Sequence, residues 1–319
     1  MQINSILDII DGKLLNSPSI SFIYSFKTDV NKIKEGDLFI ASNLDDVQIA
    51  VQRGAFAIIT ENFYPIIDNE IAWIKVDNIT NAIVKLLRYK LATFNLQAYF
   101  CNIVSFNLLK ALSSYEKNLK FISNNFDELL SSLDDINENT ILISKDIELL
   151  NKLYPNNCVF EKEKFEISNL IEHSLFETSF TYKNIYFQKI KIPSIYVEDF
   201  IRIYDFLNIS DFDDSKLKNF NFFKPTFLDK NFNIVEFGKS DRFIIVQNEL
   251  SLIKKEVNYL EEKFSYAKKI YLSSQDIKSI ENLKEIIKKQ SFNALFITGF
   301  ELEQIQQALL KEEKELSLF

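Results

Sequence analysis

Glycine is absent from residues 55–237, which make up more than half of this 319-residue chain. The sequence holds five glycines in all, and Gly54 and Gly238 bound the gap. A loop that wraps around phosphate groups needs glycines, because a backbone without Cβ atoms lets several N–H groups approach a phosphate closely. We therefore exclude a P-loop of the form G-x-x-x-x-G-K-[ST], and a G-x-G-x-x-G fingerprint, from the middle of the chain.

The bulk composition is that of a folded chain with more than one domain. Hydrophobic residues make up 47% and charged residues 26%, which are ordinary values for a globular protein. A chain of 319 residues is long enough for two or three domains. The net charge of −8 argues against nucleic acid as the main partner, because phosphate backbones recruit an excess of lysine and arginine.

The cysteines and the apolar pattern indicate a cytoplasmic protein. The two cysteines, Cys101 and Cys158, cannot build a disulfide framework, so we expect buried free thiols in a reducing compartment. The segment Met1–Asp11 is amphipathic and acidic and lacks the basic region of a signal peptide. No apolar run approaches the ~18 residues of a membrane span.

Strand and helix patterns alternate over residues 1–94, which predicts a compact α/β domain. Apolar residues after Ile79 recur at helical spacing, and Gly54 is placed to end a helix. The expected helices are Asn4–Ile10, Asp45–Arg53 and Ile79–Phe94, and the expected strands are Ser19–Phe26, Leu38–Ala41, Phe56–Thr60 and Ala72–Val76.

The pattern over residues 95–222 is less regular. A hairpin is predicted from Phe176–Tyr182 and Ile185–Ile192 around the turn Lys183-Asn184, since both strands mix aromatic and polar residues. The other expected elements are strands over Ala98–Val104 and Thr140–Ile143, and helices over Phe106–Tyr115, Phe126–Leu133, Ile147–Tyr154 and Val197–Leu207.

Residues 223–319 contain three strand–helix units, which predict a small parallel sheet flanked by helices. The boundary of this Rossmann-like domain is expected near Phe223–Gly238. The strands are Arg242–Val246, Lys269–Leu272 and Ala294–Ile297, and the helices are Leu250–Phe264, Ile277–Lys289 and Leu302–Lys311. The fold class is therefore α/β, with three small domains over residues 1–94, 95–222 and 223–319.

Three patches in the first domain carry a resemblance to a known family. Residues 28–41 read T-D-V-N-K-I-K-E-G-D-L-F-I-A, residues 49–57 read I-A-V-Q-R-G-A-F-A, and residues 74–82 read I-K-V-D-N-I-T-N-A. In order and spacing they resemble the N-terminal domain of the Mur ligases, the ATP-dependent ligases that build the peptidoglycan precursor. The members that add the third amino acid or the terminal D-Ala-D-Ala dipeptide are the most similar. The alternative is that the patches are simple turn chemistry.

Weaker similarities extend the resemblance over the rest of the chain. The hairpin that ends at Pro193, followed by a helix from Val197, is similar to the end of the family's central domain. Residues 292–299, F-N-A-L-F-I-T-G, resemble a strand of its third domain, with Thr298 where lysine is usual. The resemblance implies a Mur-ligase-like arrangement of three domains, with the third Rossmann-like.

The residues that the family uses for chemistry are missing at the matching positions. Its phosphate loop would lie at Asn102–Lys110, which reads N-I-V-S-F-N-L-L-K, without glycine and without a Lys-Thr or Lys-Ser pair. The segment 95–222 is also shorter than the family's ATPase domain. In the first patch the family's arginine is replaced by Asn31, and only Asp29 of that motif remains. We take Asp29, Asn31 and Asp77 as remnants of a ligand site, with an exposed turn as the alternative for Asp29.

Other side chains are better explained without chemistry. His173 is the one histidine and is expected at the surface or as a cap. The acidic residues lack the ligand spacing of a calcium loop and are expected in solvated loops: Asp134, Asp135, Asp211, Asp213 and Asp214. The aromatic residues Phe220, Phe222 and Phe223 suggest a surface for a partner, with packing between two domains as the alternative.

These observations lead to one main hypothesis about function. The chain is expected to be a non-catalytic Mur-ligase-like protein that binds or scaffolds in cytoplasmic peptidoglycan precursor synthesis. Its partner would be an active Mur ligase or another wall-synthesis protein, and we expect no cofactor, no catalytic residue and no metal site.

Two alternatives stay open. The chain could be an enzyme of other chemistry on a small nucleotide or sugar, with a site at the carboxyl ends of strands near Asp77, Asn248 or Thr298-Gly299. It could also be a structural α/β protein unrelated to the wall.

Overall fold

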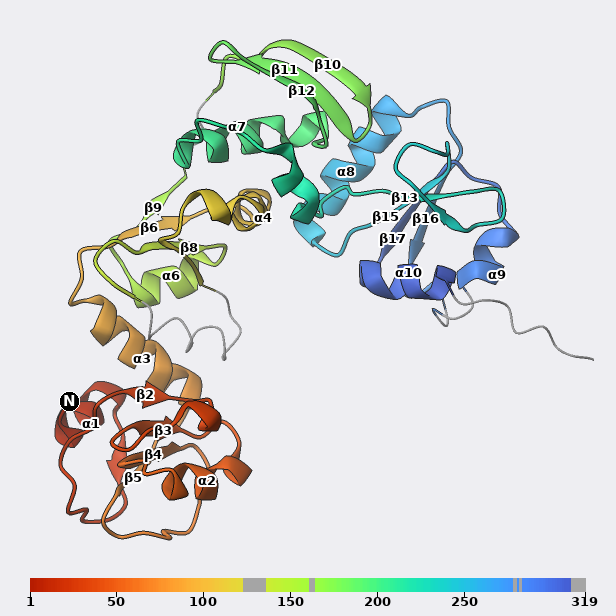
Figure 1. Cartoon of the computed structure of the whole chain (residues 1–319). Coiled ribbons are helices and arrows are strands. Elements are labelled where there is room, and N and C mark those ends of the chain that lie inside the picture. The colour runs from red at the N-terminus through yellow and green to blue at the C-terminus, as the bar shows by residue number, and fades with distance from the viewer. Residues whose placement is uncertain (123–135, 161–163, 278–279, 281–282, 311–319) are drawn as a thin grey trace, which may run out of the picture. The chain divides into compact units, whose positions relative to one another are not determined.

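The computed structural model describes residues 1–122, 136–160, 164–277, 280 and 283–310. The chain divides into two compact units (Figure 1). The first unit consists of Met1–Phe106 with Glu116–Lys162, and the second of Asn107–Tyr115 with Glu163–Phe319. The predicted α/β class is confirmed, since parallel sheets and helices occur in both units. The predicted division into three domains stays a prediction.

A five-stranded sheet with the order β1-β5-β4-β3-β2 begins the first unit. Strands β2 to β5 run parallel, and β1 joins β5 antiparallel. The strands are β1 (Lys13–Leu14), β2 (Phe26–Lys27), β3 (Leu38–Ile40), β4 (Ala57–Thr60) and β5 (Ala72–Lys75). Strands β3 and β4 are buried along their whole length, because apolar side chains of both faces are covered by helices.

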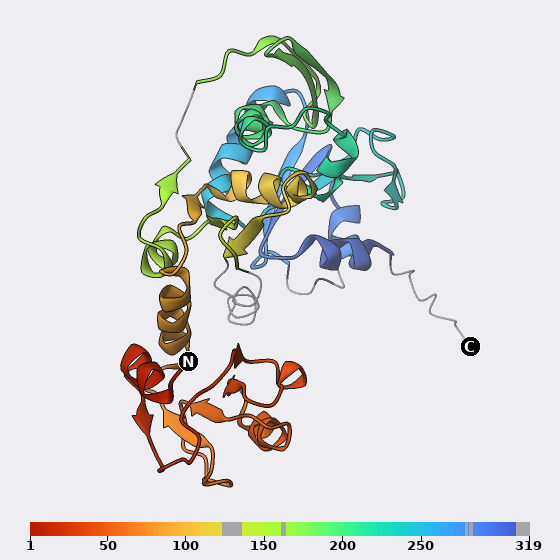
Figure 2. The ribbon, with the colours of Figure 1, turned by 60° about the vertical axis from the view of Figure 1, so that its left-hand side comes forward.

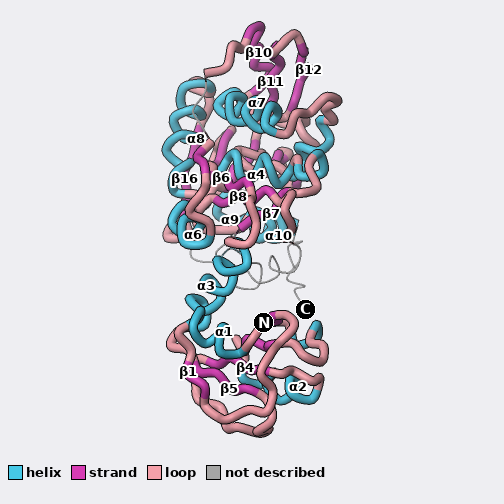
Figure 3. The backbone as a smooth tube through the Cα atoms, turned by 90° about the vertical axis from the view of Figure 1, so that its left-hand side faces the viewer, coloured by secondary structure: helices cyan, strands magenta, loops and turns pink. Residues whose placement is uncertain are grey.

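Three helices cover this sheet: α1 (Ile3–Ile10), α2 (Val47–Gln52) and α3 (Ile79–Leu91). Helices α1 and α3 share one apolar cluster with Leu38, Ile40 and Ile59, while α2 belongs to a second cluster on the other face of the sheet (Figure 3). Short 3₁₀ helices at Val30–Lys32 and Leu44–Asp46 complete the connections. The strands alternate their side chains between these two clusters, as the pleat requires.

The predicted strand Ser19–Phe26 is wrong over most of its length, because only Phe26 lies in β2. The residues before it pair with the start of the chain instead. The Ile3 N–H donates to the Ser21 carbonyl (2.9 Å), and the Ile23 N–H donates to the Met1 carbonyl (2.8 Å). Backbone groups used in this way are not available for a sheet ladder.

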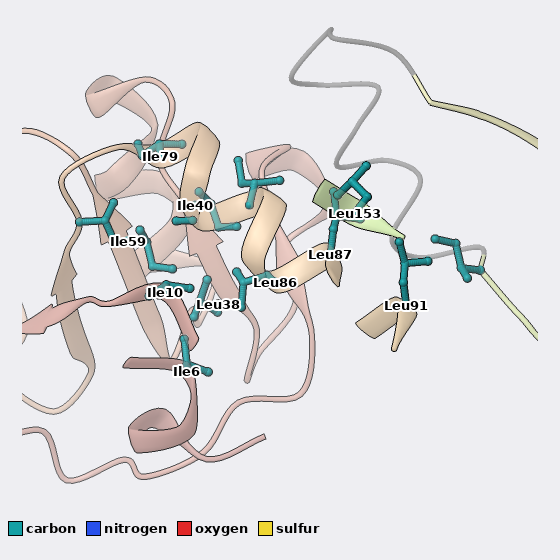
Figure 4. Close-up of a cluster of buried hydrophobic side chains, with 14 of the residues drawn as sticks. Ile6, Ile10, Leu38, Ile40, Ile59, Ile79, Leu86, Leu87, Leu91 and Leu153 are labelled. Atoms are coloured by element: carbon teal, nitrogen blue, oxygen red, sulfur yellow. The ribbon is translucent and has the colours of Figure 1, made fainter. Parts of the chain in front are cut away.

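Helix α3 forms where the apolar spacing predicted it. The side chain of Asn78 caps its first turn by accepting a hydrogen bond from the Asn81 N–H (2.8 Å). Its buried face places Leu86 and Leu87 in one cluster with residues of the five-stranded sheet and with Leu153 (Figure 4). Burial of this face, rather than helix propensity alone, holds the helix in place.

A parallel sheet of order β7-β8-β6-β9 forms the rest of the first unit. Its strands are β6 (Gln97–Phe100), β7 (Leu119–Ile122), β8 (Ile141–Ser144) and β9 (Cys158–Val159), and its helices are α4 (Ile103–Ala111), which continues into the second unit, and α6 (Ile147–Leu153). A 3₁₀ helix covers Ser113–Tyr115. The predicted strand Ala98–Val104 is wrong at its end, since Val104 is already helical. The predicted helix Phe126–Leu133 lies outside the described residues.

A three-stranded antiparallel sheet, β10-β11-β12, begins the second unit. Its strands are β10 (Ser168–Ser174), β11 (Glu177–Tyr182) and β12 (Ile185–Ile190). The predicted hairpin is confirmed, and its turn residues Lys183 and Asn184 both have positive φ (47° and 64°), as a two-residue hairpin turn requires. Helix α7 (Val197–Phe206) packs on this sheet, with the rings of Phe187 and Phe200 5.5 Å apart (Figure 1).

The last sheet has the order β14-β13-β15-β17-β16. The three predicted strands are parallel, which confirms the Rossmann-like pattern, and two short strands from the expected boundary region add antiparallel. The strands are β13 (Thr226–Leu228), β14 (Ile234–Val235), β15 (Phe243–Val246), β16 (Lys269–Ser273) and β17 (Ala294–Thr298), and the helices are α8 (Leu250–Lys263), α9 (Leu283–Lys288) and α10 (Leu302–Leu310). Helices α9 and α10 lie together on one side of the sheet, and α8 lies on the other (Figure 2).

Within the described parts of the chain, no helix is both long enough and apolar enough to cross a membrane.

We predict that Leu86→Ala destabilises the first unit by about 2–5 kcal/mol, the cost of deleting a fully buried leucine side chain and leaving a cavity. Urea unfolding monitored by the fluorescence of Trp73, the chain's one tryptophan, measures this change. Tyr89→Ala is the matched control on the same helix, because Tyr89 is 50% exposed. Equal stability of the two variants would contradict the assignment of this helix face to the core.

Candidate functional site

The connection between β6 and α4 is two residues long. Strand β6 ends at Phe100 and α4 begins at Ile103, so only Cys101 and Asn102 lie between them. The Cys101 N–H donates to the Ser144 carbonyl (3.0 Å). The Asn102 side-chain oxygen accepts a hydrogen bond from the Ser105 N–H (2.8 Å) and so caps the helix. The strand therefore passes directly into the helix, without a loop.

Side chains fill the space around this connection. Cys101, Val104 and Ser105 are buried, with exposed fractions of 1–2%. The ring of Phe106 is 4% exposed and lies 5.3 Å from the ring of Phe121, edge to face. A P-loop instead turns several successive N–H groups toward a phosphate before the helix starts. A two-residue connection has no room for that arrangement.

A second feature is a hollow of about 470 Å³ beside the Asp29–Asn31 turn. Three lysines line it, Lys27, Lys32 and Lys34, together with Asn31 and one acidic residue, Asp37. Asp29 does not line it; its carboxylate accepts a hydrogen bond from the Asn31 N–H (2.9 Å) and caps the 3₁₀ helix that follows. This geometry fits the alternative that Asp29 is a residue of an exposed turn.

Arg53 is the residue near this turn that the sequence reasoning missed. From the end of α2, its guanidinium donates to the carbonyls of Val30 (3.2 Å) and Asn31 (2.8 Å), and it lies 3.4 Å from the Asn31 side-chain oxygen. The signal available in the sequence was the position of Arg53 next to Gly54. The Gly36 N–H donates to the Gly54 carbonyl (2.9 Å), which brings the end of α2 beside the first patch.

Asp77 is not brought together with the other two proposed remnants. It is exposed and follows β5, whereas Asp29 and Asn31 follow β2. Strands β3 and β4 lie between β2 and β5, which separates the two strand ends by roughly 14 Å at the usual spacing of strands. One small ligand at the Asp29–Asn31 turn would not reach Asp77 without spanning the edge of the sheet.

Asn248 and Gly299 do meet, at the carboxyl ends of β15 and β17. The Asn248 side-chain oxygen accepts from the Gly299 N–H (2.7 Å), and its amide group donates to the Phe300 carbonyl (2.7 Å). Gly299 has φ +84°, and a Cβ there would lie 2.6 Å from Oγ of Ser274. The Asn248 amide thus locks one loop to another and is already used in hydrogen bonds.

The three phenylalanines proposed as a partner surface differ in exposure. Phe220 and Phe223 are buried, at 4% and 1%, and their rings contact Tyr196 (5.9 Å) and Tyr259 (5.4 Å). Phe222 is half-buried, and all three phenylalanines are among the residues that line an apolar hollow of about 270 Å³. Phe220 and Phe223 mainly serve packing inside the second unit, and Phe222 is the most accessible of the three.

The remaining polar candidates have local structural roles. His173 is exposed, with Nε2 2.7 Å from Oγ of Ser179. Asp213 accepts a hydrogen bond from the Ser215 N–H (2.9 Å), and the hydrogen bonds from Ser215 lower the pKa of its carboxyl. Asp211 and Asp214 are exposed, while Asp134 and Asp135 lie outside the described residues. Over the part of the chain that the structure describes, no three His, Cys, Asp or Glu residues are grouped so that they could hold a metal ion.

Both cysteines are free thiols, as expected, but the expected burial is wrong for Cys158. Cys101 is buried and is itself the first of the two residues of the β6–α4 connection. Cys158 belongs to β9, a two-residue strand at the edge of its sheet, where both residues are exposed. An edge position leaves one side of the strand open to solvent.

A buried carboxyl group in α8 was also missed. Glu256 is 0% exposed; its Oε1 accepts from the Tyr196 hydroxyl (2.5 Å) and the Gln247 amide (2.8 Å), while Oε2 has no partner among the described residues. Burial raises the pKa of Glu256 to about 7 and also raises that of Tyr196. The signal in the sequence was a glutamate on the helix face formed by Leu252, Tyr259 and Leu260.

The comparisons with known proteins concern the whole fold. No family model and no curated protein matches the sequence. Among solved structures, the chain is similar to the MurF ligase from Thermotoga maritima in complex with ADP, with a TM-score of 0.52, 14% identity, and 89% of this chain and 97% of that chain covered. It is equally similar to the UDP-N-acetylmuramoylalanyl-D-glutamyl-2,6-diaminopimelate–D-alanyl-D-alanyl ligase from Acinetobacter baumannii, with a TM-score of 0.52, 10% identity and 97% of both chains covered. The chain therefore has a Mur-ligase-like fold, as the sequence patches predicted.

We predict that Glu256 lowers the stability of the second unit as pH rises. The folded pKa is about 7 and the ordinary value is 4.5, so between these values the folded state holds a proton that the unfolded chain has lost. The free energy of unfolding then falls by about 3 kcal/mol from pH 4.5 to pH 7.5. Urea unfolding of the wild type and of Glu256→Gln at several pH values measures the difference.

The Glu256→Gln variant cannot ionise and should lack this part of the pH dependence. Glu262→Gln, an exposed change on the same helix, should behave as the wild type. The same dependence of the unfolding free energy on pH in the wild type and in Glu256→Gln would contradict the prediction. The Glu256 carboxyl would then ionise in the folded state without lowering stability.

Proposed function

We propose that this chain is a non-catalytic Mur-ligase-like protein that binds or scaffolds other proteins of peptidoglycan precursor synthesis. Its fold is the premise of this proposal, because the solved structures that it resembles are ligases of that pathway by name. The single observation that carries the non-catalytic part is the two-residue connection between Phe100 and Ile103.

Phosphoryl transfer depends almost entirely on positioning the phosphates and neutralising their charge. At the β6–α4 connection Asn102 accepts hydrogen bonds from the N–H groups of Ser105 and Phe106, and the ring of Phe106 packs against that of Phe121. The nearest lysine in this segment, Lys110, lies two helical turns further on. Residues 55–237 contain no glycine that could open such a loop. These features support the proposal that the chain keeps the ligase fold but does not hold a triphosphate at the β6–α4 connection.

The lysine-lined hollow beside Asn31 supports a remnant of ligand binding in the first unit. Its three lysines outnumber its one carboxylate, Asp37, so the lining carries a net positive charge, which suits an anionic ligand such as a sugar nucleotide. Arg53 is held on backbone carbonyls beside Asn31. In this proposal Asp29 shapes the turn rather than contacting the ligand, and Asp77 belongs to a separate place on the sheet edge.

We expect no detectable binding of ATP with magnesium ions by isothermal titration calorimetry at protein concentrations that detect millimolar affinity. A catalytically active Mur ligase serves as the positive control under the same conditions. A micromolar dissociation constant for this chain would overturn the non-catalytic proposal, above all if Ser105→Ala or Lys110→Ala weakened it.

We expect saturable binding to at least one purified Mur ligase of the same organism, measured by biolayer interferometry. If the accessible aromatic side chain at the 270 Å³ hollow is the contact, Phe222→Ala weakens the complex by about tenfold or more, as truncating an aromatic anchor does. Phe63→Ala, which removes an 83% exposed ring in the first unit, is the matched control. Failure of every Mur ligase to bind would reject an active Mur ligase as the partner of this chain.

A further inference from the structure

A hollow of about 500 Å³ in the second unit has the size of a small-molecule site. Three segments form it: the turn between β10 and β11, the loop that leads into β15, and the C-terminal end of α8 with the residues after it. Its lining includes no residue of the β6–α4 connection or of the lysine-lined turn, and it shares Phe176, Phe227 and Phe237 with the neighbouring hollow of about 270 Å³.

Aromatic rings form the wall of this hollow. Phe176 is the central ring, with its centroid 4.9 Å from Phe243 and 6.4 Å from Phe237. Phe264 lies 5.7 Å from Phe243, and Tyr266 lies 5.0 Å from Phe264. Phe176 and Phe243 are buried (5% and 3% exposed), Phe264 is half-buried, and Tyr266 is 86% exposed. The rings thus lead from solvent to the interior as a continuous apolar lining.

The charged groups around the rings are mainly acidic. Three carboxylates and one lysine line the hollow, and the lysine, Lys263, is paired with Glu172 at 2.9 Å. That pairing leaves Glu177 and Asp241 without a cation among the described residues. Asp241 accepts a long hydrogen bond from the Asn293 amide (3.4 Å), and the Glu177 carboxylate has no hydrogen bond or ion pair with the residues that the structure describes. Two carboxylates uncompensated by a neighbouring cation favour a positively charged ligand.

The same aromatic wall already accepts a cation on the side of a neighbouring hollow. Phe237 lines both hollows, and the ammonium group of Lys191, which lines only the neighbouring one, lies 4.8 Å from the centroid of its ring. Ring faces attract cations through their quadrupole, and the attraction grows where water is excluded. Aromatic ring faces and carboxylates are the two kinds of group that act together in binding an organic cation, and this hollow has both.

We propose that this hollow binds an organic cation: an ammonium or guanidinium group carried on an apolar stem. The stem lies along the rings of Phe176, Phe243 and Phe264, and the charged end lies against Glu177 and Asp241. The cation is either a free small amine or the lysine or arginine side chain of a bound peptide, since both present the same chemistry. This inference rests on the hollow alone and is independent of the ATP and scaffolding proposals.

The test uses the full chain and ligand-observed NMR with pentylammonium, and with 1-pentanol as the neutral probe of the same length. We expect pentylammonium to bind and 1-pentanol to bind at least about tenfold more weakly. The double change Glu177→Gln with Asp241→Asn should weaken pentylammonium binding by about tenfold and leave 1-pentanol unaffected. Asp211→Asn with Asp214→Asn removes the same charge from exposed residues outside the hollow and should change neither.

A second arm identifies the source of the cation. The peptide acetyl-Gly-Lys-Gly-amide is compared with its Nζ-acetylated form as a competitor of pentylammonium. Competition by the unmodified peptide alone would assign a peptide side chain, and competition by neither would assign a free amine. Equal binding of pentylammonium and 1-pentanol, or unchanged affinity in the Glu177→Gln, Asp241→Asn variant, would overturn the proposal.

Discussion

Burial of apolar side chains on both faces of short parallel strands is the constraint on which both units depend. Strands β3, β4 and β17 are almost entirely buried, so each needs helices on both sides. In the first unit α1 and α3 cover one face and α2 the other, and in the second unit α9 and α10 lie opposite α8. This layering fixes where the loops between strands and helices lie, and so where the hollows form.

A chain so poor in glycine makes its turns with other residues. Several residues other than glycine have positive φ, among them Asp11, Asn184 and Asn208. Asparagine and aspartate tolerate this conformation because their short side chains bond locally. Turns can therefore be built without glycine, but a backbone that must press several N–H groups against a phosphate cannot. In this chain β6 passes into α4 through two residues, where a phosphate-binding loop would need glycines.

The sequence predicted the elements whose pattern is local and missed those whose pattern is not. Helix α3 and the hairpin at Lys183-Asn184 follow from spacing and turn residues, and both appear in the structure. Strand β10 was missed because all its residues are exposed, so it shows no alternation of apolar and polar residues. Arg53 beside Asn31 was missed for a related reason: the contact joins residues far apart in the sequence.

By itself the sequence determined the α/β class, the likeness to Mur ligases and the lack of a glycine-rich loop, because each depends on residue types at short spacing. Only the tertiary structure decided which side chains meet. It buried Phe220 and Phe223, separated Asp77 from Asn31, and enclosed Glu256 with no partner for Oε2 among the described residues. It also brought Phe176, Phe243 and Phe264 into one hollow with the carboxylates of Glu177 and Asp241. These groupings depend on how strands and helices from distant parts of the chain pack, and no local pattern encodes that packing.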